Sequence, residues 1–378
     1  MASQSDKLRI LEICFSNGKG GLELYMANIG QYLAERGHQV WYGAKADSFL
    51  YEKLSTREVS LFPMTPKRRY LDFKIANKIA ATIRENKIDI IHAHQSADLS
   101  TLILSRNKAG RGKLVFTQQM ESSRTKKDLF HRWVYGNLDA LIAITDRIKN
   151  QAEKNTPLPP QKIHRLYYGI DLKRFKPDPR QRDSSRKKFG ISSEEVAIGM
   201  VGRLEEGKGQ HILLQGMGRL QEQLPRVKVL LIGSETVGQR GYESRLKRLA
   251  EELGIGQRVI FTGFQEDVPA VSAALDITVL ATKKETFGLS LIETMAQEIA
   301  PIGTAAGGVP EIIEDDMNGL LVPSFDIDAL ANALQKLIND PALRKRLGVR
   351  ARKTVQEKFN LENHLAGLEK IFFDVINR

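Results

Sequence analysis

Short apolar segments alternate with amphipathic segments along nearly the whole chain, and this alternation restricts the fold more than any other feature. Apolar runs of about four to eight residues are typical of buried strands, and helices between them are typical of parallel sheets. In the first half we predict strands at residues 8–15, 38–42, 88–93, 113–117, 140–144 and 164–166, and helices at 22–36 and 73–86. This pattern predicts an α/β fold.

A polar, proline-containing stretch interrupts the alternation after residue 170, and a second alternating part follows. There we predict strands at 196–201, 227–232, 259–262, 275–280, 300–303 and 319–322, and helices at 209–223, 243–252, 327–338, 341–359 and 363–375. Since 378 residues exceed one ordinary core, two domains with a cleft between their sheet edges are expected. The predicted boundaries are 1–172, a linker at 173–188, 189–359, and a C-terminal helix within 360–378.

The composition narrows the classes of partner. A formal net charge of +12 indicates an anionic partner, but no helix-turn-helix, RNP or zinc-finger pattern accompanies it, so nucleic acid is not expected. The single cysteine, Cys14, allows neither an internal disulfide nor a cysteine zinc cluster, and no metal-ligand spacing is visible elsewhere. No apolar run approaches the roughly 20 residues of a membrane span, and the first residues lack a signal-peptide core. We therefore expect a cytoplasmic protein.

Two glutamates, Glu285 and Glu293, flank the junction between the predicted strand at 275–280 and a following helix. Glu285 would lie at the carboxyl end of the strand, where open α/β sheets bind ligands, and Glu293 in the first turns of the helix. The backbone N–H groups that open this helix can receive a phosphate, and they belong to Phe287, Gly288 and Leu289. Carboxylates beside a phosphate site suit a nucleotide sugar.

Arg203 and Lys208 follow the predicted strand at 196–201 in a glycine-containing loop. We expect both to bind a diphosphate, with Arg203 as a planar fork and Lys208 as a flexible point charge. They would also offset the negative charge that accumulates when a nucleoside diphosphate departs. The alternative is a solvated basic loop in which they pair with Glu205 and Glu206.

In the first half, Gly20 and Gly21 lie in the first strand-to-helix turn, where the absence of a Cβ lets the backbone approach a ligand. Glu23 either caps the helix or contacts an acceptor. His94 follows the strand at 88–93 and is expected to point into the site. His92 lies deeper on the same face and is expected to be structural.

Gly263 and Phe264 end another strand of the second half. We expect them to present backbone groups to a nucleobase, although Phe264 could equally belong to the core. Gly307, Gly308 and Pro310 are expected to shape a turn rather than to contact substrate.

The chain resembles the retaining, nucleotide-sugar-dependent glycosyltransferases of family 4, which have the GT-B fold. The resemblance covers nearly the whole chain and rests on five motifs, at residues 18–23, 91–94, 202–209, 285–293 and 307–323. It implies two facing Rossmann-like domains, an acceptor domain followed by a donor domain, with the C-terminal helix crossing back to the first. It also implies that no metal or other cofactor is needed.

The resemblance implies specific roles as well. Glu293 would bind the ribose hydroxyls, Glu285 would lie beside the donor sugar, and His94 would contact that sugar or order the reacting groups. The expected catalytic residues are therefore Glu285, His94, Arg203 and Lys208. Many relatives have a histidine near Gln119 and an asparagine at the position of Tyr168. Because of these two departures, the resemblance does not identify the acceptor.

The function implied is transfer of a hexose from a nucleotide diphosphate-sugar, UDP-linked rather than GDP- or ADP-linked, to a glycan or lipid-linked acceptor. Cell-surface polysaccharide or lipopolysaccharide synthesis is the expected setting. Two alternatives are a nucleotide-sugar 2-epimerase of similar architecture and a non-catalytic protein that binds nucleotide sugars or nucleic acid.

Three basic segments of the first half, at residues 67–74, 106–113 and 124–133, interleave positive charge with aromatic residues. This composition is typical of surfaces that contact anionic lipid headgroups. It predicts a peripheral association with the inner face of the plasma membrane, the alternative being ordinary solvated charge.

Overall fold

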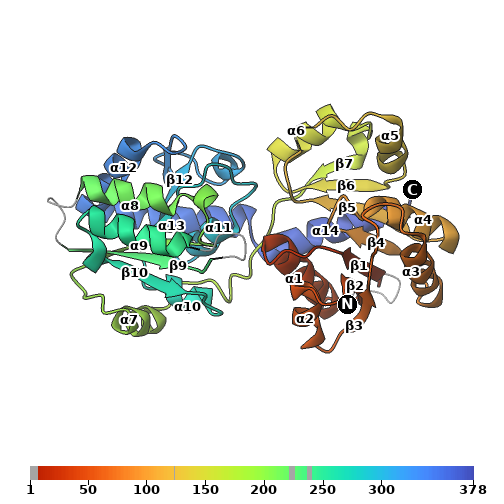
Figure 1. The fold of residues 1–378 in the computed structure, drawn as a ribbon, viewed down its shortest axis with the longest axis horizontal. Helices are drawn as coiled ribbons and strands as arrows, with labels where there is room; N and C mark the ends of the chain where they lie inside the picture. Colours follow the sequence, from red (N-terminus) through yellow and green to blue (C-terminus); the bar gives the residue numbers. More distant parts are fainter. Residues whose placement is uncertain (1–6, 123, 221–225, 236–240) are drawn as a thin grey trace. The chain divides into compact units, whose positions relative to one another are not determined.

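The computed structural model describes residues 7–122, 124–220, 226–235 and 241–378. The chain divides into two compact units, residues up to 167 together with 364–378, and residues 168–363. Each unit contains one parallel sheet with helices packed on it (Figure 1). The α/β class with two Rossmann-like domains is therefore confirmed. The chain enters the second unit after Tyr167, five residues before the predicted boundary at residue 172.

The sheet of the first unit has seven parallel strands in the order β3-β2-β1-β4-β5-β6-β7. They are β1 (Arg9–Cys14), β2 (Gln39–Lys45), β3 (Ser60–Met64), β4 (Ile90–Ala93), β5 (Lys113–Gln118), β6 (Ala140–Ala143) and β7 (Ile163–Arg165). The strand order reverses between β1 and β4, which pair directly. In open α/β sheets, ligands bind beyond the carboxyl ends of the strands at such a switch point.

Four helices of this unit begin at N-cap residues whose side chains accept backbone hydrogen bonds. The oxygen atoms of Ser48, Asp72, Asp128 and Thr145 accept hydrogen bonds from backbone N–H groups in the first turns that follow. Up to residue 167, the helices of this unit are α1 (Gly21–Glu35), α2 (Phe49–Ser55), α3 (Phe73–Glu85), α4 (Leu99–Ala109), α5 (Leu129–Gly136) and α6 (Asp146–Asn155).

Five of these elements, β3, α2, α4, α5 and α6, were not predicted. Strand β3 contains Pro63 and lies at the edge of the sheet, the place where a missing backbone donor is tolerated. Helix α4 is buried over most of its first seven residues, including Ser100, Thr101 and Ser105, so it lacks the one-sided apolar pattern of a surface helix.

The second unit has a six-stranded parallel sheet in the order β10-β9-β8-β11-β12-β13. Its strands are β8 (Val196–Val201), β9 (Val227–Ile232), β10 (Val259–Gly263), β11 (Ile277–Leu280), β12 (Ala300–Thr304) and β13 (Leu320–Val322). The order reverses between β8 and β11, which pair through Ile198 and Ile277. The second switch point is therefore flanked by the two strands that precede Arg203 and Glu285.

The helices of this unit pack against two apolar clusters, a large one on one face of the sheet and a smaller one on the opposite face. They are α7 (Pro179–Lys188), α8 (Gln210–Arg219), α9 (Tyr242–Glu252), α10 (Val268–Ser272), α11 (Leu289–Met295), α12 (Ile327–Asn339) and α13 (Pro341–Lys358), with short 3₁₀ turns η3 (Glu206–Lys208) and η5 (Val309–Glu311). Helix α8 ends at Arg219, and the last residues of the predicted helix at 209–223 lie outside the described residues.

The segment expected to be a linker at 173–188 contains helix α7, which is part of the second unit. Arg182 and Arg186 form ion pairs with Asp276 at 2.6 and 3.1 Å, and Arg186 is buried. Asp276 also accepts the N–H of Ala197 at the start of β8. Charged residues that look solvated in the sequence therefore anchor this helix to the sheet.

Helix α14 (Leu361–Ile376) packs within the first unit from His364 onward. It buries Leu365, Leu368, Ile371, Phe372 and Val375. The carboxylate of Glu369 accepts two hydrogen bonds from Arg36 at 2.8 and 2.9 Å. The end of the chain is thus held by apolar burial together with a bidentate ion pair.

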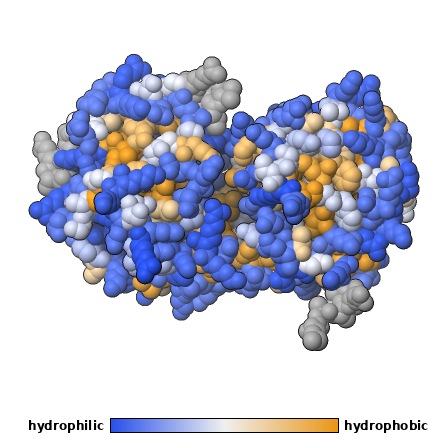
Figure 2. All heavy atoms as spheres, turned by 90° about the horizontal axis from the view of Figure 1, so that it is seen from below, coloured by the Kyte–Doolittle hydropathy of each residue, from blue (hydrophilic) through white to orange (hydrophobic). Residues whose placement is uncertain are grey.

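The face shown in Figure 2 is mainly hydrophilic, with hydrophobic patches between the polar side chains. Within the described ranges, the exposed large apolar side chains are Leu24, Tyr70, Phe73, Met120, Leu129, Phe264, Met317 and Val349. Single exposed apolar residues are normal, so only those that lie together bear on function.

Candidate active site

The switch point of the second unit brings together a lysine and a glutamate that are far apart in the sequence. Lys208 ends the turn η3 after β8, and Glu285 lies on the loop after β11. Their side chains form an ion pair with Nζ to Oε2 at 2.8 Å, and they are 23% and 15% exposed. The pair therefore lies at the surface, with the lysine ammonium accessible to a ligand.

Glycines hold this loop arrangement tightly. Gly209 has φ +83°, and a Cβ there would lie 2.0 Å from the carbonyl oxygen of Ala281. The carbonyl of Gly207 accepts hydrogen bonds from the hydroxyl of Thr282 and the N–H of Lys283, both at 3.0 Å. The loops after β8 and β11 are thus pinned together, which fixes the backbone beneath Lys208.

A second glycine pair fixes Glu285. A Cβ on Gly307, which has φ +61°, would lie 1.7 Å from the carbonyl oxygen of Glu285. The N–H of Gly308 donates to the same oxygen at 2.9 Å. These two glycines shape the backbone of the Glu285 loop, which agrees with the expected turn-forming role.

Arg203 follows β8 but is held loosely. Its guanidinium is 48% exposed and pairs with Glu205 at 3.2 Å, as the alternative interpretation had it. Its backbone is better fixed, because the carbonyl accepts the side-chain amide of Gln210 at 2.8 Å. An exposed pair of this kind contributes little stability, so the guanidinium can exchange Glu205 for a phosphate at little cost.

The residues that open α11 differ in their roles. Phe287 is buried, with its ring packed edge-to-face between Tyr168 and Phe359 at 5.2 and 5.7 Å. Gly288 has φ +115° and precedes the first helical residue, Leu289. Only backbone groups of Phe287 are thus suited to a ligand. Tyr168 belongs to this aromatic cluster.

Glu293 is a carboxylate in an unfavourable environment. Burial raises the pKa of its side chain to about 7, and the positive charge of Arg174 opposes this rise. In the part of the chain that the structure describes, its carboxylate has no hydrogen-bond or ion-pair partner, and its residue is only partly exposed. A partly buried acceptor without a hydrogen-bond partner among the described residues is suited to a ligand hydroxyl.

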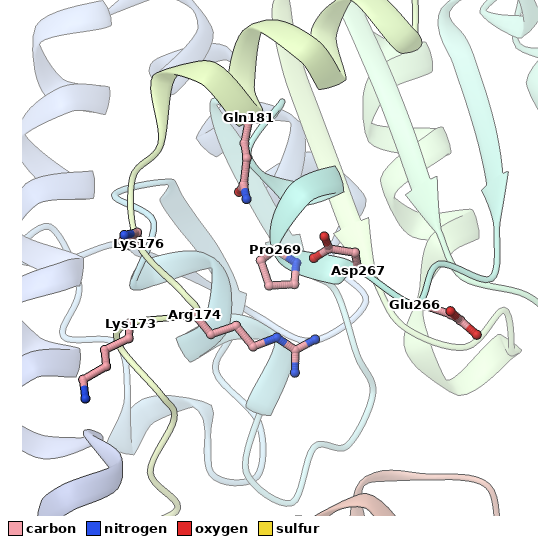
Figure 3. A pocket seen from close by; sticks show the side chains of 7 residues that line it. All are labelled: Lys173, Arg174, Lys176, Gln181, Glu266, Asp267 and Pro269. Atoms are coloured by element: carbon pink, nitrogen blue, oxygen red, sulfur yellow. The ribbon is translucent and has the colours of Figure 1, made fainter. Parts of the chain in front are cut away.

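Arg174 also lines a pocket of about 450 Å³, together with Lys173, Lys176, Gln181, Glu266, Asp267 and Pro269. In Figure 3 its guanidinium extends into the pocket toward Pro269 and Asp267, whereas Lys173 and Glu266 point away. The pocket adjoins the predicted nucleobase segment, because only Gln265 separates Gly263 and Phe264 from its acidic residues. Phe264 is 71% exposed, so it does not belong to the core.

In the first unit, His94 follows β4 at the first switch point and is 1% exposed. Its Nε2 lies 2.5 Å from Oε2 of Glu12, and its Nδ1 lies 3.2 Å from the amide nitrogen of Gln119. His92 bonds to the same carboxylate at 3.0 Å and to the hydroxyl of Thr117 at 2.7 Å. His92 is therefore structural, as expected, and His94 has protein partners on both nitrogens.

These three side chains correct one expectation. The sequence showed no group of metal-ligand residues, but the fold places ligand-type atoms of Glu12, His92 and His94 within 4.8 Å of one another. Nδ1 of His92 and Nε2 of His94 are both hydrogen-bonded to the carboxylate of Glu12. Burial lowers the pKa of His94, and interactions with both histidines hold the pKa of Glu12 below its usual value despite burial.

The glycine turn after β1 is closed by Glu23. Its carboxylate accepts the N–H of Gly20 at 2.9 Å and a hydrogen bond from the hydroxyl of Ser16. Glu23 thus caps α1, which is one of the two roles considered for it. Gly21 begins the helix, and the N–H of Gly20 already has a partner.

Two residues of the site were missed by sequence reasoning. Glu12 had a signal, since a charged residue in the apolar run at 8–15 needs a partner inside the protein. Arg174 had none, because it lies in a stretch dense in lysine and arginine, and only the fold shows which of these charges faces Glu293.

Two family models match the chain, one described as Glycosyltransferase Family 4 over residues 19–174 and one as Glycosyl transferases group 1 over residues 181–354. The chain belongs to the group 1, family 4 glycosyltransferases. This glycosyltransferase is 28% identical to N-acetyl-alpha-D-glucosaminyl L-malate synthase of Bacillus anthracis in an alignment of 389 positions that covers 98% of each protein. It is 31% identical to D-inositol 3-phosphate glycosyltransferase of Mycobacterium ulcerans over 211 residues, which cover 55% of this chain and 44% of that protein.

Solved structures share the fold of this glycosyltransferase. Anabaena HepE in complex with UDP and glucose matches 96% of this chain and 98% of its own, with a TM-score of 0.84 at 22% identity. A glycosyltransferase from Rickettsia africae matches 99% and 100%, with a TM-score of 0.90 at 21% identity. At these identities the likeness establishes the GT-B fold.

Proposed function

We propose that this glycosyltransferase transfers a sugar from a nucleotide diphosphate-sugar, with UDP as the nucleotide, to a glycan or lipid-linked acceptor with retention of configuration. The observation that carries the proposal is the Lys208–Glu285 pair at the switch point between β8 and β11. A cation and a carboxylate on two glycine-pinned loops can bind the diphosphate and the sugar of one donor.

In the proposed reaction the bond between the sugar C1 and the diphosphate oxygen breaks, and a bond from C1 to the acceptor oxygen forms on the same face. The acceptor proton passes to the departing phosphate. Lys208 and Arg203 stabilise the charge that develops on this phosphate. Because the leaving group is already an anion paired with cations, no general acid is needed on that side.

Glu293 is proposed to accept hydrogen bonds from the ribose hydroxyls. Its carboxylate lacks protein partners in the described residues, and Arg174 is the charge that favours its ionised form. The choice of UDP is supported by the solved structures with this fold whose bound ligands are named as UDP or UDP-glucose.

The donor is tested by thermal-shift and turnover assays with UDP-, GDP- and ADP-sugars, with and without EDTA. We expect stabilisation by UDP and slow release of UDP from one UDP-sugar, both unchanged by EDTA, since cationic side chains take the place of a metal. Stabilisation by GDP or ADP alone would contradict the choice of nucleotide. Conversion of the donor sugar without acceptor, seen by NMR, would instead favour the epimerase alternative.

A lipid-linked acceptor is supported by a surface of the first unit, formed by the segments 67–74 and 124–133. The two segments meet where the rings of Tyr70 and Phe130 contact each other at 5.8 Å. Leu129, Phe73 and Tyr70 are 85%, 54% and 45% exposed there. Both segments contain several lysines and arginines, and the Arg69 guanidinium lies 5.4 Å from the centre of the Tyr70 ring. We propose that this basic–aromatic surface binds anionic lipid headgroups.

In the third basic segment, residues 106–113, the arginines form ion pairs within the fold. Arg106 pairs with Asp139 at 3.1 Å, and Arg111 pairs with Asp89 at 3.0 Å. Its arginine charges are thus neutralised within the fold, and only the other two segments contribute to the proposed surface. No helix in the described ranges combines the length and the apolar character needed to cross a bilayer.

Vesicle flotation tests the basic–aromatic surface. We expect binding to vesicles that contain phosphatidylglycerol, little binding to pure phosphatidylcholine, and loss of binding as salt is raised, because the attraction is electrostatic. The double variant Leu129→Ser/Phe73→Ser should lower recovery at least about fivefold, since two inserted apolar side chains are lost. Val349→Ser, at an apolar side chain on α13 that is 47% exposed, is the control. Equal recovery with both lipids would refute the proposal.

A further inference from the structure

The network around His94 lies at the switch point of the first sheet, where β1 and β4 are neighbours. Glu12 on β1 is in register with His92 on β4, so both project from the same face of the sheet. That face is covered by α14, whose Phe372 ring packs edge-to-face on His92 at 5.3 Å. Glu12, His92 and His94 are 0%, 0% and 1% exposed, so each proton in the network must have a protein acceptor.

The hydrogen-bond partners determine where these protons lie. An ionised carboxylate only accepts, so the nitrogens that face Glu12, Nδ1 of His92 and Nε2 of His94, must carry hydrogen. A neutral imidazole then presents a lone pair at its other nitrogen. Both such lone pairs meet donors, the hydroxyl of Thr117 for His92 and the amide of Gln119 for His94. Every atom of the network is satisfied in this one arrangement.

We propose that Glu12 is a positioning residue for sugar transfer: by accepting hydrogen bonds from both histidines of His92-Ala93-His94, it fixes His94 as a neutral imidazole whose Nδ1 is a hydrogen-bond acceptor. A sugar hydroxyl can then replace the Gln119 amide as the donor to this nitrogen. This inference rests on the proposed function. The inference extends the proposed function by assigning a role to Glu12. Through Glu12 it also assigns a role to Gln119, near which many relatives have a histidine.

The surroundings support a fixed tautomer rather than a protonated histidine. Burial lowers the pKa of His94, although the hydrogen bond to Glu12 and the charge of Glu12 oppose this decrease. The Tyr25 ring lies edge-on at 5.7 Å from the His94 ring, and its hydroxyl is bonded to His364 at 2.9 Å. His364 in turn bonds to the carbonyl of Tyr167 at 2.6 Å. No carboxylate other than Glu12 is hydrogen-bonded to His94 among the described residues.

The tautomer is measured by long-range ¹H–¹⁵N NMR of histidine-labelled protein at pH 7.5, with the signals assigned through single histidine variants. In the wild type we expect His94 to carry its proton on Nε2 and His92 on Nδ1. In Glu12→Gln, the amide NH₂ group must donate to one of the two rings, so that ring must present a lone pair at this nitrogen and change tautomer. Glu12→Asp keeps the charge and should keep the tautomers. Glu58→Gln, at an exposed glutamate, is the matched control.

Kinetics provide the second measurement. With the UDP-sugar that turns over, Glu12→Gln should lower kcat about tenfold, the effect of losing one hydrogen bond in the transition state, and Glu12→Asp should recover part of it. The dissociation constant of UDP should stay within about twofold, because the proposed diphosphate residues belong to the other unit. A purely structural role would lower Tm without this split between kcat and UDP binding.

Several outcomes would overturn the inference. One is a proton on Nδ1 of His94 in the wild type, and another is an unchanged histidine spectrum in Glu12→Gln. A third is a stoichiometric metal ion found by mass spectrometry, because a metal bound to Glu12 and both histidines would displace the two protons. If Glu12→Gln does not fold, the wild-type spectrum and Gln119→Ala still decide, since His94 must keep its Nε2 proton when only Gln119 is removed. Absence of turnover with every donor would refute the proposed function, while the spectra would still test the proton arrangement.

Discussion

Replacing Lys208 by methionine should lower kcat by about 10²–10³-fold, the usual cost of removing one preorganised charge from a developing anion. The side chain keeps its length, and the glycine-pinned loops around it stay intact, so the effect should come from the lost charge. The donor KM should rise less than kcat falls, because the diphosphate gains negative charge mainly in the transition state. Steady-state kinetics with the donor found by screening measure both parameters.

One complication of this variant can be removed by design. Lys208→Met leaves Glu285 without its partner at 2.8 Å, and an unpaired carboxylate would itself repel a diphosphate. In the double variant Lys208→Met/Glu285→Gln that repulsion is absent. We expect kcat to stay low in the double variant, and recovery to near wild-type activity would show that Lys208 only neutralises Glu285. Lys345→Met, at an exposed lysine on α13, is the control.

The second large effect concerns Glu293, where binding and stability should change in opposite directions. Glu293→Gln should raise the donor KM and the dissociation constant of UDP by roughly 10–100-fold, because charged hydrogen bonds to the ribose are lost. The same variant should raise Tm at pH 8, because it removes a buried carboxylate without a protein partner. Isothermal titration and thermal unfolding measure the two effects on one preparation.

The pH dependence of this stabilisation has a definite sign. The pKa of Glu293 is raised from 4.5 to about 7 in the folded protein, so protonation favours folding, and the wild type loses stability as pH rises toward and through 7. The difference in Tm between variant and wild type should therefore be small at pH 5 and largest at pH 8. The full pKa shift corresponds to roughly 3 kcal/mol of unfolding free energy, and partial exposure of Glu293 keeps the gain of the variant below this value. Each kcal/mol should raise Tm by about 2–4 °C.

Glu252→Gln, at an exposed glutamate on α9, should change neither Tm nor UDP affinity. If Glu293→Gln bound UDP as well as the wild type and showed the same Tm difference at pH 5 and pH 8, then Glu293 would be an ordinary surface carboxylate. The ribose contact would have to be made elsewhere.

Much of the fold could be predicted because the strands of a buried parallel sheet are continuous apolar runs, which stand out in any sequence. The elements missed were those with a weaker signal, such as the edge strand β3 with its proline and helix α4, whose first half is buried. The segment at 173–188 looked like a linker because its arginines appear solvated. Two of them are ion-paired to Asp276, which lies about 90 residues further along the chain.

The sequence by itself determined the family, the two parallel sheets, and the identity of the loops that follow β8 and β11, because motif spacing and apolar runs are local properties. Only the tertiary structure decided which charges meet: Lys208 with Glu285, Arg174 near Glu293, and Glu12 with both histidines. The reason is that burial and electrostatic interaction depend on distances across strands and loops, and neighbouring strands of a parallel sheet come from distant parts of the chain.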